Sequence, residues 1–403
     1  MLKSISRIYI VAANEPFPVG MACTNRILSL SRGFAEHDLD VMVICLYPTE
    51  HDAGVAVNKN TRGTVGKIRY EYSCGTTIRG KNIFERRWLK VKSLFRVYQI
   101  LRGSKTCSGG KILMVYVDSP LHLILFYILS RIYRLKFIQD KSEFPFVLKN
   151  TSINGKIYAW IYTCFMYRLF DAMLVMTNPL EKYFRKRINR KTRLFRAPMT
   201  VEVSRFMNPS LPKPNQSRYI AYCGDVGGNK DGVSDLLKSF SIVHQTWPDL
   251  MLYIIGDAPG TRSLEDLKTL SLKLGISHNV VFTGRLQRDE VPKYLCNAAI
   301  LALARPSGMQ AEGGFPSKLG EYLSTSNPVV VTRVGDIPDY LTDGENAFLV
   351  EPDDVNAFAQ KIEYVLMHQD VAKEVGRRGK DVAVNNFDYK IQTQRIIEFL
   401  LGL

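Results

Sequence analysis

The sequence predicts an α/β protein made of two doubly wound, Rossmann-like domains that face each other across a cleft. Its 403 residues are too many for one ordinary core and suit two domains of roughly 200 residues each. Short apolar runs alternate with helical patterns, which is typical of parallel sheets covered by helices. The charge is also divided, because residues 1–198 hold 33 Lys and Arg against 13 Asp and Glu, whereas residues 199–403 hold 21 against 25. We therefore predict domains over 1–198 and 199–386, followed by a helix over 387–403.

The composition indicates a folded protein of a reducing compartment. Hydrophobic residues make up 46% of the chain and aromatic residues 11%, which is too much for a disordered protein. The seven cysteines are scattered and form no C-x-x-C pair, as expected for free thiols. The first apolar run is too short for the core of a signal peptide, and no stretch of about 18 uncharged apolar residues could cross a bilayer. We expect a cytoplasmic protein, either free or peripheral at the inner face of the cell membrane.

The N-terminal domain begins with a strand over 8–13, a glycine-containing loop, a helix over 24–36 and a strand over 40–46. Gly20 lies in that loop, at the carboxyl end of the first strand, where open α/β sheets bind their ligands. Two explanations fit this glycine: a backbone that lies against a ligand, or a tight turn that needs a positive φ. Residues 50–80 show no pattern that predicts an element.

A basic amphipathic helix is predicted over 84–101. Apolar residues recur there at helical spacing, and Lys and Arg occupy most of the remaining positions. One interpretation is a helix that packs on the sheet of the first domain and keeps a solvated basic face. The other is a helix at an anionic membrane surface, supported by residues 182–196, of which eight are basic. Nucleic acid is not expected as a partner, because no nucleic-acid-binding module is recognisable.

The first domain continues with a strand over 112–117, a helix over 121–134 and a strand over 136–139. Asp140 follows the last of these strands, so its carboxylate is expected at the ligand-binding edge of the sheet. The alternative is that Asp140 only caps its own loop. A buried strand over 171–176 completes the predicted sheet.

The C-terminal domain opens with a strand over 219–223, a glycine-rich loop that ends near Lys230, and a helix over 233–243. A glycine loop with a lysine before a helix suits phosphate binding, because backbone N–H groups and a positive charge converge there. Arg285 follows a later strand over 280–282 and is a further candidate for the same phosphates. The other elements predicted in this region are a strand over 251–256 and helices over 264–274 and 289–295.

The segment 304–332 is the strongest signal in the chain. A buried strand over 298–303 precedes a glycine loop, a helix opens at residues 315–317 with Ser317 as its cap, and a strand follows over 329–332. The free N–H groups at the start of the helix would hold a phosphate, and Lys318 adds a charge beside them. Glu321 shares that face and could accept hydrogen bonds from a ribose diol. The alternative is an exposed Lys and Glu on an ordinary surface helix.

Residues 315–329 match F-P-x-K-x-x-E-Y-L-x-x-x-x-P-V. This stretch resembles the donor-binding signature of the GT-B glycosyltransferases of family 4, the glycosyl transferases group 1. The resemblance implies donor binding through the residues that match or directly precede the signature, which are Gly314, Phe315, Pro316, Ser317, Lys318, Leu319 and Glu321. It also implies that the terminal helix over 387–403 crosses back to the first domain.

The chain departs from the family pattern at several positions. The first of two family glutamates falls on Gly313, so its role toward sugar hydroxyls passes to the neighbouring Glu312. Lys230 matches a family lysine, but Asp231 is inserted after it, and Arg285 would replace an arginine that the loop lacks. In the resemblance, Asp140 takes the place of a histidine or aspartate beside the reacting sugar, and Gly20 lies near the donor diphosphate.

The resemblance implies a retaining transfer of a sugar from a nucleoside diphosphate sugar to an acceptor hydroxyl, with no bound metal and no cofactor. The basic first domain favours a glycan or lipid-linked acceptor of cell-surface polysaccharide biosynthesis. Two alternatives remain open: a nucleotide-sugar epimerase of the same fold, and a catalytically silent scaffold that binds a partner protein.

Overall fold

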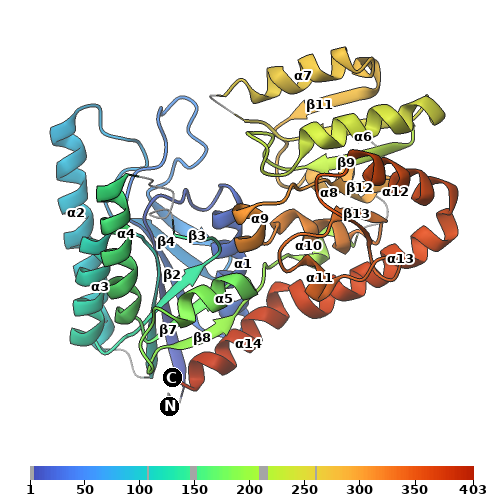
Figure 1. Cartoon of the computed structure of the whole chain (residues 1–403). Helices are drawn as coiled ribbons and strands as arrows, with labels where there is room; N and C mark the ends of the chain where they lie inside the picture. The colour runs from blue at the N-terminus through green and yellow to red at the C-terminus, as the bar shows by residue number, and fades with distance from the viewer. Residues whose placement is uncertain (1–3, 107–108, 146–151, 208–216, 259–260) are drawn as a thin grey trace. The chain divides into compact units, whose positions relative to one another are not determined.

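The computed structural model describes residues 4–106, 109–145, 152–207, 217–258 and 261–403 (Figure 1). The chain divides into two compact units, one formed by Met1–Thr200 with Tyr389–Leu403 and the other by Val201–Asp388. The divisions lie two residues beyond the predicted positions, 198 and 386. Each unit contains a largely parallel sheet with helices, which confirms the predicted α/β class.

The first unit contains an eight-stranded sheet in the order β3-β4-β2-β1-β5-β6-β7-β8. All neighbouring strands are parallel except the antiparallel pair β3 and β4 at one edge. The central strands are almost continuous apolar runs, as expected where helices cover both faces of a sheet. The strands are β1 (Ile5–Ala12), β2 (Asp40–Cys45), β3 (Arg62–Val65), β4 (Ile68–Tyr72), β5 (Gly110–Tyr116), β6 (Lys136–Lys141), β7 (Ala172–Val175) and β8 (Arg193–Arg196).

The helices of this unit are divided between the two faces by the direction of their connections. The chain moves one way along the sheet from β1 to β2 and the opposite way from β4 through β8, so right-handed crossovers place α1 on one face and α2 to α5 on the other. Figure 1 shows α2, α3 and α4 together beside the sheet. These helices are α1 (Ala22–Glu36), α2 (Ile83–Arg102), α3 (Pro120–Ile132), α4 (Ile153–Phe165) and α5 (Asn178–Arg185).

The strands β3 and β4 lie in the region where the sequence predicts no element. β3 has four residues, and three of them are exposed, so it has no apolar alternation to detect. β4 alternates buried and exposed residues but is only five residues long. A short edge hairpin of this kind leaves a weak signal.

Helix α14 (Tyr389–Leu401) belongs to the first unit and packs on α1. Gly33 of α1 allows this close approach, because a Cβ atom there would lie 2.1 Å from Thr393 Oγ1. The Tyr389 hydroxyl donates a hydrogen bond to Glu36 Oε1 at 2.6 Å. The terminal helix therefore completes the unit in which the chain begins.

Helix α2 turns the apolar stripe noted in the sequence away from the protein. The buried residues of α2 are Leu89, Ser93, Val97 and Leu101. Trp88 lies on the opposite side of the helix and is 65% exposed. The helix thus packs on the first unit and keeps an exposed basic face, as one interpretation predicted, but most of its apolar stripe is exposed and does not make this contact. Across the described residues, no helix combines the length and apolarity that a bilayer crossing needs.

The second unit contains a six-stranded parallel sheet in the order β11-β10-β9-β12-β13-β14. The order reverses between β9 and β12, which marks the point where open α/β sheets bind ligands at the carboxyl ends of their strands. The strands are β9 (Tyr219–Cys223), β10 (Met251–Ile255), β11 (Val280–Gly284), β12 (Ile300–Leu303), β13 (Val329–Thr332) and β14 (Phe348–Val350). The helices are α6 (Val233–Thr246), α7 (Ser263–Lys273), α8 (Val291–Cys296), α9 (Met309–Gly313), α10 (Ser317–Ser324), α11 (Ile337–Tyr340), α12 (Val355–Met367) and α13 (Gln369–Val382).

Candidate functional site

The candidate site lies at the reversal point of the second sheet. The glycine loop over 224–232 follows β9, and the segment over 304–316 follows β12. The two meet at Gly232, whose φ is +67° and where a Cβ atom would lie only 1.7 Å from the carbonyl oxygen of Ala304. A glycine is required there both by the conformation and by the close approach.

Replacing Gly232 tests how strongly these loops depend on each other. We expect Gly232→Ala to lower the free energy of unfolding by about 1–2 kcal/mol for its left-handed backbone and by about 1–3 kcal/mol more for the clash. Gly275 is the matched control, because it has a φ of +73° but no atom within 4 Å of a Cβ position. Urea unfolding of both variants measures the difference. Equal losses would contradict the requirement for close approach.

Helix α10 begins with an uncapped first turn. Pro316 occupies the N-cap position in an extended conformation, and no side chain caps the helix. The predicted Ser317 cap is therefore wrong, because Ser317 is already the first helical residue. The amide groups of Ser317 and Lys318 have no partner within the helix, and such groups favour an anion.

Lys318 is held by Asp231 from the glycine loop. The ammonium group forms an ion pair with Asp231 Oδ2, and the two side chains are 14% and 2% exposed. Tyr222 donates a hydrogen bond to the same oxygen at 2.9 Å, and Lys318 Nζ lies 5.6 Å from the centre of the Tyr222 ring. The pairing leaves donor capacity on Lys318, because an ammonium group has three N–H groups.

The charge of Lys318 changes the acidity of Asp231. Burial raises the pKa of the Asp231 carboxyl, but the Lys318 charge and the hydrogen bonds from Lys318 and Tyr222 outweigh it, and the pKa is lowered below its ordinary value of 3.8. The buried Arg305 acts in the same direction. Asp231 is therefore a carboxylate at neutral pH and fixes the lysine electrostatically.

This pair predicts how stability depends on pH. The pKa of Asp231 is lower in the folded protein than in the unfolded chain. The contribution of its charge to the free energy of unfolding is therefore complete above the pKa of the unfolded chain, and it is lost as the pH falls through the pKa of the folded protein. We expect the difference in unfolding free energy between wild type and Asp231→Asn to be constant from about pH 7 to pH 5 and to shrink below about pH 4. Urea unfolding across this range measures it. A difference that grows on acidification would contradict the predicted sign.

Glu321 lies on α10 one turn beyond Lys318, with its side chain 27% exposed. Arg205 Nη1 is 3.3 Å from Glu321 Oε1, and Arg205 also donates to the backbone oxygen of Arg288. Burial raises the pKa of Glu321, and the charges of Arg205 and Arg288 oppose that rise in part. The alternative of an exposed glutamate on an ordinary surface helix is therefore wrong for Glu321, because its side chain is partly buried near Arg205 and Arg288.

The remaining donor-binding predictions fall into different environments. Lys230 is half-buried in the glycine loop, whereas Arg285 is exposed just after β11. In the part of the chain that the structure describes, the Arg285 guanidinium makes no hydrogen bond or ion pair, so its contribution stays a prediction. Leu319 is fully buried in the core.

The segment before α10 contains a short helix that was predicted as a loop. Glu312 lies on this helix, α9, and is exposed. The amide group of Gly314 donates to the backbone oxygen of Gln310 at 3.2 Å. Phe315 is buried and packs against Tyr340 and Phe387, with ring centres 5.5 and 5.3 Å away. Phe315 and Leu319 thus anchor the helix rather than present their side chains to a ligand.

In the first unit, Asp140 lies inside β6 because the strand continues two residues further than predicted, to Lys141. Its oxygens accept hydrogen bonds from Arg26 Nε and Nη2 at 2.6 and 2.9 Å, and from the Tyr116 hydroxyl at 2.6 Å. Arg26 also donates to the backbone oxygens of Ala197 and Pro198. Burial lowers the pKa of Arg26, but the Asp140 charge and hydrogen bonds raise it further than burial lowers it. The role of Asp140 beside a sugar stays a prediction.

Gly20 is explained by packing. Its φ is not among the positive values found in the described chain, so the predicted tight turn is absent. A Cβ atom would instead lie 2.2 Å from Thr24 Oγ1 and 2.8 Å from the Pro16 ring. The loop is also held by Asn58, which donates to the backbone oxygen of Val19 at 2.9 Å and accepts from its amide at 3.0 Å. A ligand contact at Gly20 remains a prediction.

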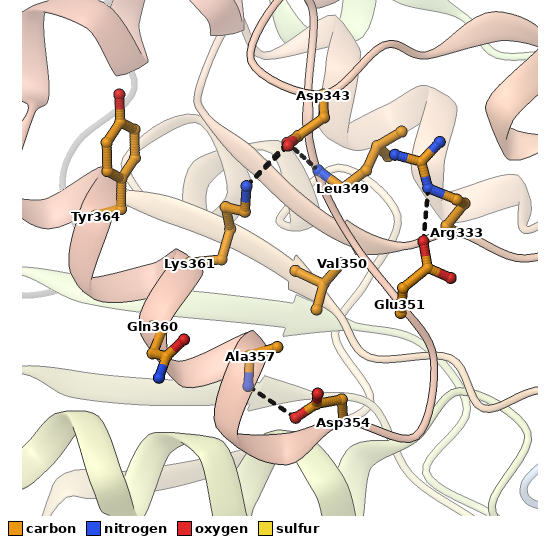
Figure 2. Close-up of a pocket in the computed structure, with 10 residues that line it drawn as sticks. All are labelled: Arg333, Asp343, Leu349, Val350, Glu351, Asp354, Ala357, Gln360, Lys361 and Tyr364. Carbon is orange, nitrogen blue, oxygen red and sulfur yellow. Dashed lines mark hydrogen bonds and ion pairs between the residues drawn. The ribbon is translucent and has the colours of Figure 1, made fainter.

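A separate surface pocket of about 490 Å³ lies beside β14 and α12 (Figure 2). Asp343 accepts hydrogen bonds there from Lys361 and from the amide group of Leu349, and Arg333 is paired with Glu351. The residues that line this pocket include none of the predicted site residues. Since these charged groups bind one another, the pocket is not the candidate site.

The sequence did not reveal Asp231 as the partner of Lys318 or Arg205 as the partner of Glu321. In the sequence, Asp231 stood out only because it is inserted into the glycine loop after Lys230. That insertion was the one feature that could have pointed to it. Arg205 lies in a short 3-10 helix (Val203–Phe206) with no pattern of its own. In the described residues, no group of three or more His, Cys, Asp or Glu is arranged to hold a metal ion.

Comparison with known proteins shows that much of the second unit is similar to one protein family. Residues 217–368 match the family model described as glycosyl transferases group 1. A GDP-mannose-dependent alpha-(1-6)-phosphatidylinositol monomannoside mannosyltransferase of Mycolicibacterium smegmatis is 29% identical over 180 residues, which cover 43% of this chain and 45% of that protein. Sulfoquinovosyl transferase SQD2 of Arabidopsis thaliana is 28% identical over 180 residues, covering 44% of this chain and 32% of that protein. The chain spans less than half the length of these curated relatives.

Solved structures resemble the whole chain. Sucrose-phosphate synthase from Thermosynechococcus elongatus has a TM-score of 0.75 at 14% identity and covers 98% of both chains. Anabaena HepE in complex with UDP-glucose has a TM-score of 0.72 at 14% identity, covering 98% of this chain and all of that one. At these identities the likeness shows the fold, which is GT-B.

Proposed function

We propose, from the membership of residues 217–368 in the glycosyl transferases group 1, that the chain is a glycosyltransferase. It would move a sugar from a nucleoside diphosphate sugar to an acceptor hydroxyl. The observation that carries this proposal is the first turn of α10, where uncapped amide groups, Lys318 and Glu321 lie on one helix at the reversal point of the sheet. This arrangement suits a ligand that carries both phosphates and a diol.

Lys318 and the first-turn amide groups of α10 would bind the diphosphate. As the bond to the sugar breaks, negative charge grows on the leaving diphosphate, and positive groups already in place stabilise that charge without reorganising. Asp231 keeps the ammonium group of Lys318 oriented while two of its N–H groups stay available. Lys230 would add a second positive charge from the glycine loop.

Glu321 would bind the ribose. Arg205 occupies Oε1, which leaves Oε2 to accept hydrogen bonds from the ribose hydroxyl groups. Arg205 and Arg288 lower the pKa of Glu321 against the effect of burial, so they favour the charged form that accepts both bonds. Glu312 and Asp140 are proposed to contact the sugar, the former from α9 and the latter from the first unit.

The finer features of the proposal are retention of the anomeric configuration and a lipid-linked or membrane-proximal acceptor in cell-surface polysaccharide biosynthesis. Support comes from the family resemblance of residues 315–329, from the phosphatidylinositol monomannoside named for one relative, and from the excess of basic residues over 1–198. A position on the cytoplasmic side of the cell membrane fits the same features.

A thermal-shift screen of nucleoside diphosphate sugars tests the proposal. We expect at least one UDP or GDP sugar to raise the melting temperature, and Glu321→Ala to abolish the shift. Glu345→Ala is the matched control, because Glu345 is an exposed glutamate of the same unit. No shift with any sugar nucleotide would contradict donor binding and favour a scaffold. Donor consumption without an added acceptor and without hydrolysis would indicate an epimerase.

A further inference from the structure

Among the described residues, the largest group of exposed apolar side chains lies on three helices of the first unit. On α2, residues Phe84, Trp88, Val91, Phe95 and Tyr98 are exposed, from 38% for Tyr98 to 78% for Phe84. Their spacing of three and four residues places them in one stripe along the helix. Because the buried residues of α2 lie on the opposite side, this stripe points directly away from the core.

Helix α3 repeats this arrangement. Its exposed residues Leu121, Ile124, Ile128 and Ile132 follow the same spacing, and its buried residues occupy the opposite side. The helix contains no charged residue before its last turn. A helix of a water-soluble surface would carry polar residues at these four outward positions.

Helix α4 supplies a third stripe with Ile153, Ile157 and Trp160, the last of which is 65% exposed. The three helices are neighbours on one face of the sheet (Figure 1). α2 contacts α3 through the rings of Tyr98 and Tyr133, whose centres are 6.3 Å apart, and Arg131 of α3 reaches the segment directly after α4. The stripes therefore lie on neighbouring helices of one face of the sheet, and we call them together the three-helix face.

The charges on the three-helix face identify its partner. Across α2, α3 and α4 there are eight Lys and Arg but only one acidic residue, Glu85. Arg87 and Lys92 are exposed on either side of the apolar stripe of α2. A second copy of this chain would bring like charges together, whereas an anionic bilayer attracts the basic residues and accepts the apolar ones. The two tryptophans suit the boundary between headgroups and acyl chains.

We propose that the three-helix face inserts its apolar side chains into the surface of an anionic lipid bilayer. The basic residues bring the protein to the surface, and the apolar side chains hold it there, so attachment is not purely electrostatic. This binding surface is distinct from the proposed nucleotide site in the second unit. The inference does not rest on the proposed transfer reaction.

Flotation of the full chain with vesicles tests this inference. We expect wild type to float with phosphatidylcholine vesicles that contain phosphatidylglycerol and to keep part of that binding at 0.5 M salt, where electrostatic attraction alone is screened. The double variant Trp88→Ser with Trp160→Ser should bind about tenfold or more weakly at both salt concentrations. Arg87→Gln with Lys92→Gln should weaken binding at low salt and have little effect at high salt.

Leu272→Ser with Met367→Ser is the matched control, since both residues are exposed apolar residues of the second unit. Quenching by brominated lipids gives an independent measurement: Trp88 and Trp160 should be quenched and Trp247 should not. Absence of flotation at low salt, or flotation that the tryptophan variant leaves unchanged, would overturn the proposal. Wild-type dimers that the tryptophan variant converts to monomers, without vesicle binding, would show that a second copy covers the face instead.

The sugar-nucleotide thermal shift separates this inference from the proposed reaction. The Trp88→Ser and Trp160→Ser variant should retain any shift that the wild type shows, because the substituted residues lie outside the second unit. Cooperative urea unfolding of the variant, followed by far-UV circular dichroism, shows separately that its first unit is folded.

Discussion

Lys318→Met is expected to lower donor-dependent activity strongly and to destabilise the second unit. The substitution removes a charge that stabilises the leaving diphosphate, so kcat should fall by about 10²–10³-fold. It also leaves Asp231 as a buried carboxylate without its lysine, which typically costs about 3–5 kcal/mol. Initial rates and urea unfolding measure the two effects separately.

The double variant Lys318→Met with Asp231→Asn distinguishes catalysis from stability. Without the buried carboxylate, most of the lost stability should return, because a neutral amide near Tyr222 has a smaller desolvation cost. Activity should stay low, because the positive charge is still missing. A folded Lys318→Met protein with wild-type kcat would remove Lys318 from the proposed site.

Arg26→Met is expected to have the largest effect in the first unit. Arg26 and Asp140 are both buried, and the arginine also binds the backbone oxygens of Ala197 and Pro198 at the end of the unit. The variant leaves Asp140 with only the Tyr116 hydrogen bond, so the free energy of unfolding should fall by about 3–5 kcal/mol. Urea unfolding measures the loss, and the exposed Arg62→Met is the matched control.

Asp140→Asn then distinguishes the two roles considered for this residue. If the carboxylate mainly holds Arg26, stability should fall and kcat of the folded protein should change little. A large fall in kcat at nearly unchanged stability would support the predicted position beside the sugar. Equal stability of wild type and Arg26→Met would contradict the importance of the buried pair.

The sequence predicted the fold because its signals are local. The parallel strands are dense apolar runs, and the glycine loops after β9 and β12 lie at the reversal point of the sheet. Lys318 and Glu321 were found because both belong to one short helical segment. Each of these predictions rests on residues that are only a few positions apart in the chain.

Long-range contacts account for most of what the sequence did not predict. Asp231 and Lys318 are 87 positions apart, and Arg205 and Glu321 are 116 apart, so neither pair forms a local pattern. Asp140 was placed beyond its strand because its burial depends on Arg26, which is 114 positions away. The orientation of α2 could not be predicted, because both of its sides carry apolar residues. Only the structure shows which side is buried.

The return of α14 to the first unit has a consequence for synthesis on the ribosome. Gly33 of α1 packs against Thr393 of α14, and the ribosome translates all of Val201–Asp388 between these two residues. The second unit can therefore reach its native state as soon as it emerges, whereas α1 keeps an uncovered apolar side until α14 has been made. The first unit is synthesised first but should complete its folding last. We therefore expect it to depend more on chaperones than the second unit does.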